Sequence, residues 1–214
     1  MEVWTFFKMD LKSNWKSILS VMGMDILYAC MSHTDPYYFI PSLILWTIAV
    51  ANMLFDKERK QESRFLYMLP VAKQSRVLAR YLMIFVFSLS GVTGYFIGKI
   101  VNYHLFDHRF EKVGASSAML FSVTVFMISL TYIISYKVGK TESEVLDRIL
   151  PILIAGVLMV GIIWMIPETV YSMLYDYVLQ HMQISAILSL ILSIGMWMIG
   201  MIVSSKIFEK KDFV

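Results

Sequence analysis

The chain has 214 residues, of which 58% are hydrophobic and 16% are charged, and its mean hydropathy is +0.65. These values exclude a soluble globular domain, and a net charge of +3 is too weak to indicate a nucleic-acid partner. Several apolar runs joined by short loops leave no room for a separate nucleotide-binding domain. We therefore expect an all-α, polytopic membrane protein with a single transmembrane domain over residues 1–214.

Residues 1–16 are predicted to form a short helix at the membrane surface. An apolar stripe at helical spacing is flanked by lysines, namely Trp4, Phe7, Leu11 and Trp15 with Lys8, Lys12 and Lys16. Trp rings anchor in the headgroup region, and lysine side chains extend from it toward water. The segment is too polar for a cleaved signal peptide, so we expect an interfacial helix on the cytoplasmic side.

Six apolar runs follow, each close to the ~20 residues that cross a bilayer core. They cover residues 17–33, 37–55, 81–101, 115–136, 149–166 and 183–205. The first run is short and contains Asp25, and a turn at 32–36 joins it to the second run as a hairpin. We therefore expect six transmembrane helices.

Lysine and arginine are distributed unevenly between the loops. Sixteen of the nineteen lie in the amino terminus and in residues 56–80, 137–148 and 206–214. The remaining three are Lys99, Arg109 and Lys112. Because short cytoplasmic loops accumulate these residues, we expect both termini in the cytoplasm, with 206–214 as a cytoplasmic tail.

The two longer loops expected outside carry polar and aromatic residues. Residues 102–114 contain His104, Asp107 and His108, and histidines four residues apart can share a metal ion. A convincing third ligand is missing from the sequence, so we interpret this loop as interfacial lining and predict no metal site. Residues 167–182 continue an apolar helical face, and whether they lie along the membrane or re-enter it stays open.

Residues 56–80 form the most highly charged segment of the chain. Their first half favours a helical extension of the second span, and Pro70 ends that helix and suits the first turn of a new one. The new helix leads directly into the third span. Contact with lipid headgroups explains its basic residues. The apolar cluster at 65–68, rimmed by both signs of charge, is instead typical of a docking surface for a cytoplasmic protein.

The sequence lacks catalytic motifs. Gly139, Lys140 and Thr141 match the end of a phosphate-binding loop, but Ile134 stands where that motif requires glycine. Hydrolase and metalloprotease motifs are also missing from the sequence. We expect that the chain alone is not an enzyme and binds no cofactor.

A few polar residues and one pair of glycines stand out within the predicted spans. Asp25, Asn52 and Lys99 are candidate residues of a transport pathway, because an ionisable group in a membrane is costly. For Asp25 the alternatives are a position near the headgroups or a structural hydrogen bond to Ser or Tyr. Gly94 and Gly98 allow close approach of another helix, within the chain or across a dimer.

These features together resemble the permeases of type-2 ABC exporters, particularly the short six-helix bacterial ones. The resemblance covers essentially the whole chain and includes the loop ESRFLYMLPVAKQSRVLARYL and the ending IFEKKDF. It implies a coupling helix that docks on a separate cytoplasmic ATPase. The matching residues are Glu62, Arg64, Phe65, Leu69, Pro70, Val71, Lys73 and Arg76.

The resemblance implies the permease subunit of an ATP-driven exporter in the bacterial plasma membrane. Its partners would be two ATPase subunits that bind ATP and Mg²⁺, a second identical or related permease, and membrane lipids. Related exporters carry phenol-soluble modulins, antibiotics or bacteriocins, which suggests an amphipathic peptide or a hydrophobic small molecule as cargo. The residues alone leave open the substrate, the direction of transport and a homodimer or heterodimer.

The residues also leave an alternative from another class of protein. A self-contained ion-coupled carrier or a membrane assembly scaffold would use the basic loop only to contact lipid. An ATPase that is encoded beside this chain or co-purifies with it would distinguish the two interpretations.

Overall fold

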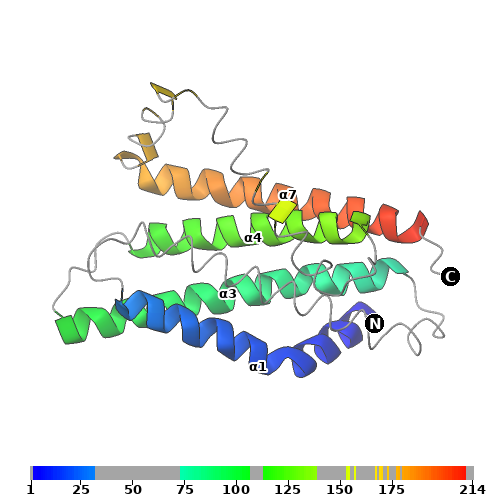
Figure 1. Cartoon of the computed structure of the whole chain (residues 1–214), viewed down its shortest axis with the longest axis horizontal. Helices are drawn as coiled ribbons and strands as arrows, with labels where there is room; N and C mark the ends of the chain where they lie inside the picture. Colours follow the sequence, from blue (N-terminus) through cyan, green and yellow to red (C-terminus); the bar gives the residue numbers. More distant parts are fainter. Residues whose placement is uncertain are drawn as a thin grey trace.

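The computed structural model describes residues 2–31, 73–106, 113–138 and 180–210, with 153, 154, 157, 167, 169, 170, 173, 177 and 178. Four long helices account for most of them: α1 (Glu2–Met31), α3 (Lys73–Phe106), α4 (Val113–Val138) and α7 (Met182–Lys210). Figure 1 shows these helices side by side along the long axis of the molecule. The described part of the chain therefore confirms the all-α fold class.

Three of the described helices are long and apolar enough to cross a membrane. The candidate spans are Gln74–His104 of α3, Gly114–Lys137 of α4 and Met182–Glu209 of α7. They contain the predicted spans 81–101, 115–136 and 183–205. The predicted span 37–55 lies outside the described residues, and so does most of 149–166, so a total of six spans stays a prediction.

The predicted interfacial helix and the first predicted span form one continuous helix. α1 has 30 residues, so it is ~45 Å long, which exceeds the ~30 Å hydrocarbon core of a bilayer. Residues 1–31 contain no proline, the residue that most strongly breaks a helix, so the helix can continue from residue 16 to residue 17. Figure 1 shows that α1 changes direction along its length.

Contacts near the helix ends give the relative directions of the four helices. The Arg76 guanidinium lies 5.6 Å from the Phe6 ring centroid, and Asn102 bonds to Ala29, so α1 and α3 are parallel. The Gln74 amide donates to Glu209 at 2.6 Å, so α7 runs antiparallel to α3. α4 runs parallel to α7, and α3 contacts all three of the other helices.

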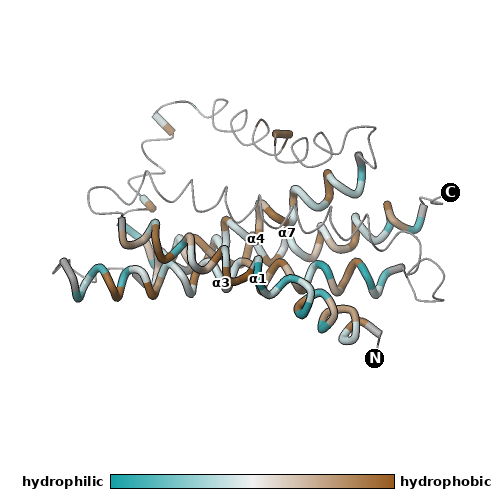
Figure 2. The backbone as a smooth tube through the Cα atoms, turned by 60° about the horizontal axis from the view of Figure 1, so that its bottom comes forward, coloured by the Kyte–Doolittle hydropathy of each residue, from teal (hydrophilic) through white to brown (hydrophobic). Residues whose placement is uncertain are grey.

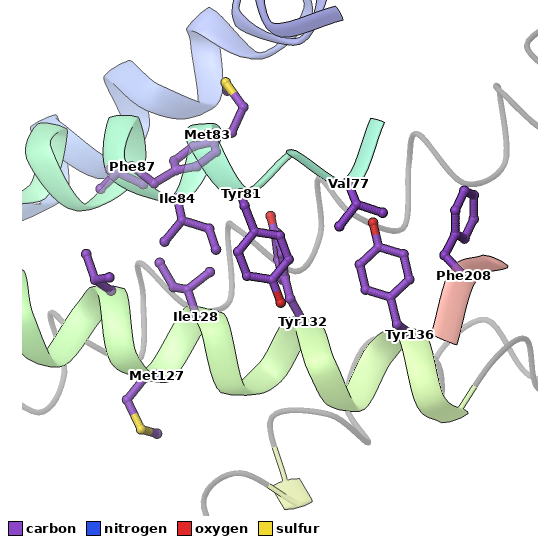
Figure 3. Packing of buried hydrophobic residues seen from close by; sticks show 12 residues of the cluster. Val77, Tyr81, Met83, Ile84, Phe87, Met127, Ile128, Tyr132, Tyr136 and Phe208 are labelled. Atoms are coloured by element: carbon purple, nitrogen blue, oxygen red, sulfur yellow. The ribbon is translucent and has the colours of Figure 1, made fainter. Parts of the chain in front are cut away.

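The largest apolar cluster lies between α3 and α4 and is completed by α1 and α7. Its buried members are Val21, Val77, Tyr81, Met83, Ile84, Phe87, Val125, Met127, Ile128, Tyr132, Tyr136 and Phe208. Figure 3 shows Ile84 of α3 facing Ile128 of α4. Five buried hydroxyls on α4 bond to carbonyls of their own helix, as Ser129 does to Val125 at 2.7 Å; they belong to Ser122, Thr124, Ser129, Thr131 and Ser135. These hydroxyls are therefore satisfied without a partner helix.

Most basic residues of the described helices lie at one end of the bundle. The starts of α1 and α3 and the ends of α4 and α7 meet at one end, which we call the basic end. The basic residues that these segments contribute are Lys8, Lys12, Lys16, Lys73, Arg76, Arg80, Lys137, Lys206 and Lys210. Figure 2 shows hydrophilic stretches toward the helix ends and hydrophobic ones between them. The segments predicted to be cytoplasmic, where they are described, thus share one end, while the side of the membrane stays a prediction.

Candidate functional site

The contact between α1 and α3 is very close at two glycines of α3. A Cβ added at Gly94 would overlap the carbonyl oxygen of Met22, and one added at Gly98 would lie 2.5 Å from Ala29 Cβ. Only glycine lets the two backbones approach to this distance. The predicted glycine pair therefore packs within the chain, where sequence reasoning left a dimer contact equally open.

Asp25 lies inside this contact. Its side chain is only 1% exposed, and a Cβ on Gly94 would lie 3.0 Å from Asp25 Cβ. Its Oδ1 atom is buried and accepts no hydrogen bond from the described residues. Among the described residues, Oδ1 therefore makes no structural hydrogen bond to Ser or Tyr, and the depth of Asp25 relative to the headgroups stays a prediction. A buried carboxylate oxygen without a donor is costly, which makes Asp25 the strongest functional candidate of the helix pair.

Polar contacts continue along the same helix pair beyond Asp25. The Asn102 amide donates to the Ala29 carbonyl at 3.2 Å, and the Cys30 thiol donates to the Gly98 carbonyl at 3.7 Å. Lys99 is half-buried, with Nζ 5.7 Å from the Tyr95 ring centroid. Asp25 and Lys99 thus belong to one helix pair, whereas the third predicted pathway residue, Asn52, lies outside the described residues.

Most of the predicted ATPase-docking residues cannot be placed on this fold. Those outside the described residues are Glu62, Arg64, Phe65, Leu69, Pro70 and Val71. Lys73 is the first residue of α3, and its side chain also falls outside the description. Arg76 is described, half-buried and packed on the ring of Phe6. This cation–π contact attaches the start of α3 to α1.

Sequence reasoning missed a polar junction of three helices. The Tyr81 hydroxyl of α3 lies 2.8 Å from Ser204 Oγ of α7, and the Trp197 indole donates to the Tyr81 carbonyl at 2.7 Å. The Tyr132 ring of α4 meets the Tyr81 ring edge-on at 5.9 Å, and Figure 3 shows the two side chains together. Gly200 leaves room for the Tyr81 hydroxyl. The spacing of Trp197, Gly200 and Ser204 on one helical face was the available signal.

The described residues contain no group of three His, Cys, Asp or Glu side chains that could hold a metal ion. His104 is exposed at the end of α3, with its ring 5.4 Å from that of Tyr103. Asp107 and His108 lie outside the described residues, as do Gly139, Lys140 and Thr141.

Long apolar helices in a bundle with one basic end define a multi-pass membrane protein. The chain matches the family model described as ABC-2 family transporter protein over residues 5–209. It therefore belongs to the ABC-2 transporter family, which indicates a permease subunit whose general partner is an ABC ATPase. Neither the comparison with curated proteins nor that with solved structures found a match.

Proposed function

We propose that this chain is the permease subunit of an ATP-driven exporter in the bacterial plasma membrane. The observation that carries the proposal is the family match over residues 5–209, which includes all the predicted spans and the charged loop at 56–80. The resemblance of that loop to exporter permeases supports export as the direction. Amphipathic peptides, or hydrophobic antimicrobials or toxins, are the proposed cargo.

The proposed division of labour leaves the chemistry to the partner. Two ATPase subunits bind ATP and Mg²⁺, and two permeases, identical or paralogous, form the pathway between them. This chain is then not an enzyme by itself, and both its termini face the cytoplasm beside the ATPases. The gathering of basic residues at one end of the bundle supports this placement, because short cytoplasmic segments accumulate basic residues.

Residues 56–80 are the proposed transmission element. α3 begins within this segment and runs without interruption from Lys73 to Phe106, so a displacement at its start reaches the opposite end of the bundle. The Arg76–Phe6 contact passes part of the same displacement to α1. Closure of the ATPases would then move α1 and α3 together, and with them Asp25, which is the proposed pathway residue of this helix pair.

Docking is tested by the amount of ATPase that stays on the purified permease when the two are expressed together. Phe65→Ala and Leu69→Ala each remove a proposed interface anchor, for which about 2 kcal/mol of binding and a roughly thirtyfold weaker complex are expected. Glu62→Gln should also weaken it, whereas Arg80→Gln, nearer the membrane, is the matched control. Full ATPase retention in all four variants would favour a self-contained carrier or scaffold.

A further inference from the structure

One side of the first half of α1 has no packing partner among the described helices. We call it the basic–aromatic face; it consists of Trp4, Lys8, Leu11, Lys12, Trp15 and Lys16. All six side chains are exposed, and the two indoles are 57% and 53% exposed. The opposite side of the helix is buried, with Phe6 and Asp10 turned inward. Among the described helices, none covers this face.

The charge on this face has one sign. Among the exposed residues of α1 between 3 and 30 there are three lysines and no carboxylate, because Asp10 and Asp25 are both buried. Two of the three lysines lie over aromatic rings of the same face. Lys8 Nζ lies 5.3 Å from the Trp4 ring centroid, and Lys16 Nζ lies 5.9 Å from that of Trp15. An anionic partner is therefore electrostatically complementary to the face.

Polarity changes along the exposed side of α1 in the same order as along a phospholipid. Beyond the lysines, the exposed large side chains are apolar, with Leu19 at 48% and Leu27 at 58% exposure. Helical side chains point back toward the amino terminus, so the ammonium groups reach toward the basic end and away from these leucines. A phosphate at the lysines would thus place its acyl chains beside Leu19 and Leu27.

We propose that the basic–aromatic face is a binding site for anionic phospholipids. The lysines hold the headgroup phosphate, the indoles lie at the headgroup level, and the apolar residues of α1 contact the acyl chains. A cytoplasmic protein would match the lysines but not the apolar continuation along the same helix. The site is independent of the cargo and of the direction of transport.

Native mass spectrometry of the detergent-purified full chain measures the binding directly. Dioleoyl phosphatidylglycerol and dioleoyl phosphatidylcholine are titrated in parallel, and the anionic lipid should bind more tightly. The variant Lys8→Gln/Lys16→Gln should weaken phosphatidylglycerol binding by about thirtyfold, since each lysine near a membrane surface contributes about a factor of five. The matched control, Lys137→Gln/Lys206→Gln, removes two exposed lysines at the same end and should change binding less than about twofold.

Three further arms make the outcome decisive. Trp4→Phe/Trp15→Phe keeps all charges and should weaken anionic-lipid binding several-fold, and circular dichroism checks that each variant is folded. Inorganic phosphate should not displace the lipid, and displacement would overturn the proposal in favour of a free-anion site. Equal losses in both lysine pairs would overturn it in favour of nonspecific charge. Reduced ATPase retention with unchanged lipid binding would assign the face to the ATPase instead.

Discussion

The Tyr81 hydroxyl and Ser204 Oγ, 2.8 Å apart, form a buried polar bridge between two antiparallel helices near the basic end of the bundle. The bridge lies two turns beyond the start of α3, directly after the loop proposed to contact the ATPase. It is accompanied by the bond from Trp197 to the Tyr81 carbonyl. A movement of α3 at this level must therefore either carry α7 with it or break these bonds.

The first prediction concerns the energy of this bridge. Tyr81→Phe and Ser204→Ala should each lower the free energy of unfolding by about 1 kcal/mol, because each removes one hydroxyl of the bridge and leaves the other without this hydrogen bond. The double variant should cost less than the sum of the two, with a coupling of at least ~0.5 kcal/mol. Thermal unfolding in one fixed detergent provides the comparison, and strict additivity would show that the two hydroxyls do not interact.

The second prediction compares a glycine packed closely against another helix, Gly98, with one that has open space beside it, Gly195. Gly98→Ala should destabilise the protein by about 1–3 kcal/mol, because the added methyl overlaps Ala29 and Ile26. Gly195→Ala on α7 should be neutral or stabilising by up to ~1 kcal/mol, since nothing lies within 4 Å of its added Cβ. Both changes are compared by melting temperature. A Gly98→Ala protein as stable as Gly195→Ala would contradict the close α1–α3 contact.

The third prediction assigns Asp25 to transport rather than to folding. Asp25→Asn keeps the shape of the side chain and should leave expression and thermal stability near those of the wild type. ATPase stimulation by substrate, or tolerance of cells to the exported compound, should change, because the asparagine amide cannot ionise. Asp10→Asn, at the other buried acid of α1, is the control and should leave both readouts unchanged. Normal transport by Asp25→Asn would give the residue a structural role only.

The fourth prediction concerns orientation in the membrane. In a Cys30→Ser background, which retains a donor for the Gly98 carbonyl, single cysteines are placed at Ser63, Thr141 and Glu168. An impermeant thiol reagent added to intact cells should label the cysteine at 168 and leave those at 63 and 141 unlabelled. Labelling at 63 would place the charged loop outside and would remove the basis for ATPase docking.

The sequence predicted the long apolar helices well, because hydropathy over ~20 residues is a property of one segment alone. The spans 81–101, 115–136 and 183–205 lie within α3, α4 and α7 for that reason. The helix boundary expected near residue 17 was wrong, because α1 continues through it as one helix. Hydropathy changes at this point, but no residue there interrupts the helical backbone. A change in polarity along a chain therefore does not mark the end of a helix.

The candidate site was predictable only as separate residues. Gly94 and Gly98 indicated close packing, but only the fold identifies α1 as their partner and places Asp25 against Gly94. The bridge from Tyr81 to Ser204 depends on the rotation of two helices that are more than a hundred residues apart in sequence. Single-helix periodicity carries no information about such a rotation, so this junction was missed.

The pairing of α1 with α3 also has a mechanical consequence for the membrane. The two helices are joined near both ends, by Phe6 with Arg76 and by Ala29 with Asn102, and their backbones interlock at the glycines between. These contacts oppose sliding of α1 along α3, so we expect the two helices to tilt or translate together. If the exposed indoles and lysines of α1 lie at the headgroups as proposed, any movement of this pair would displace headgroups, and part of the work of the ATPase would be done on the bilayer itself.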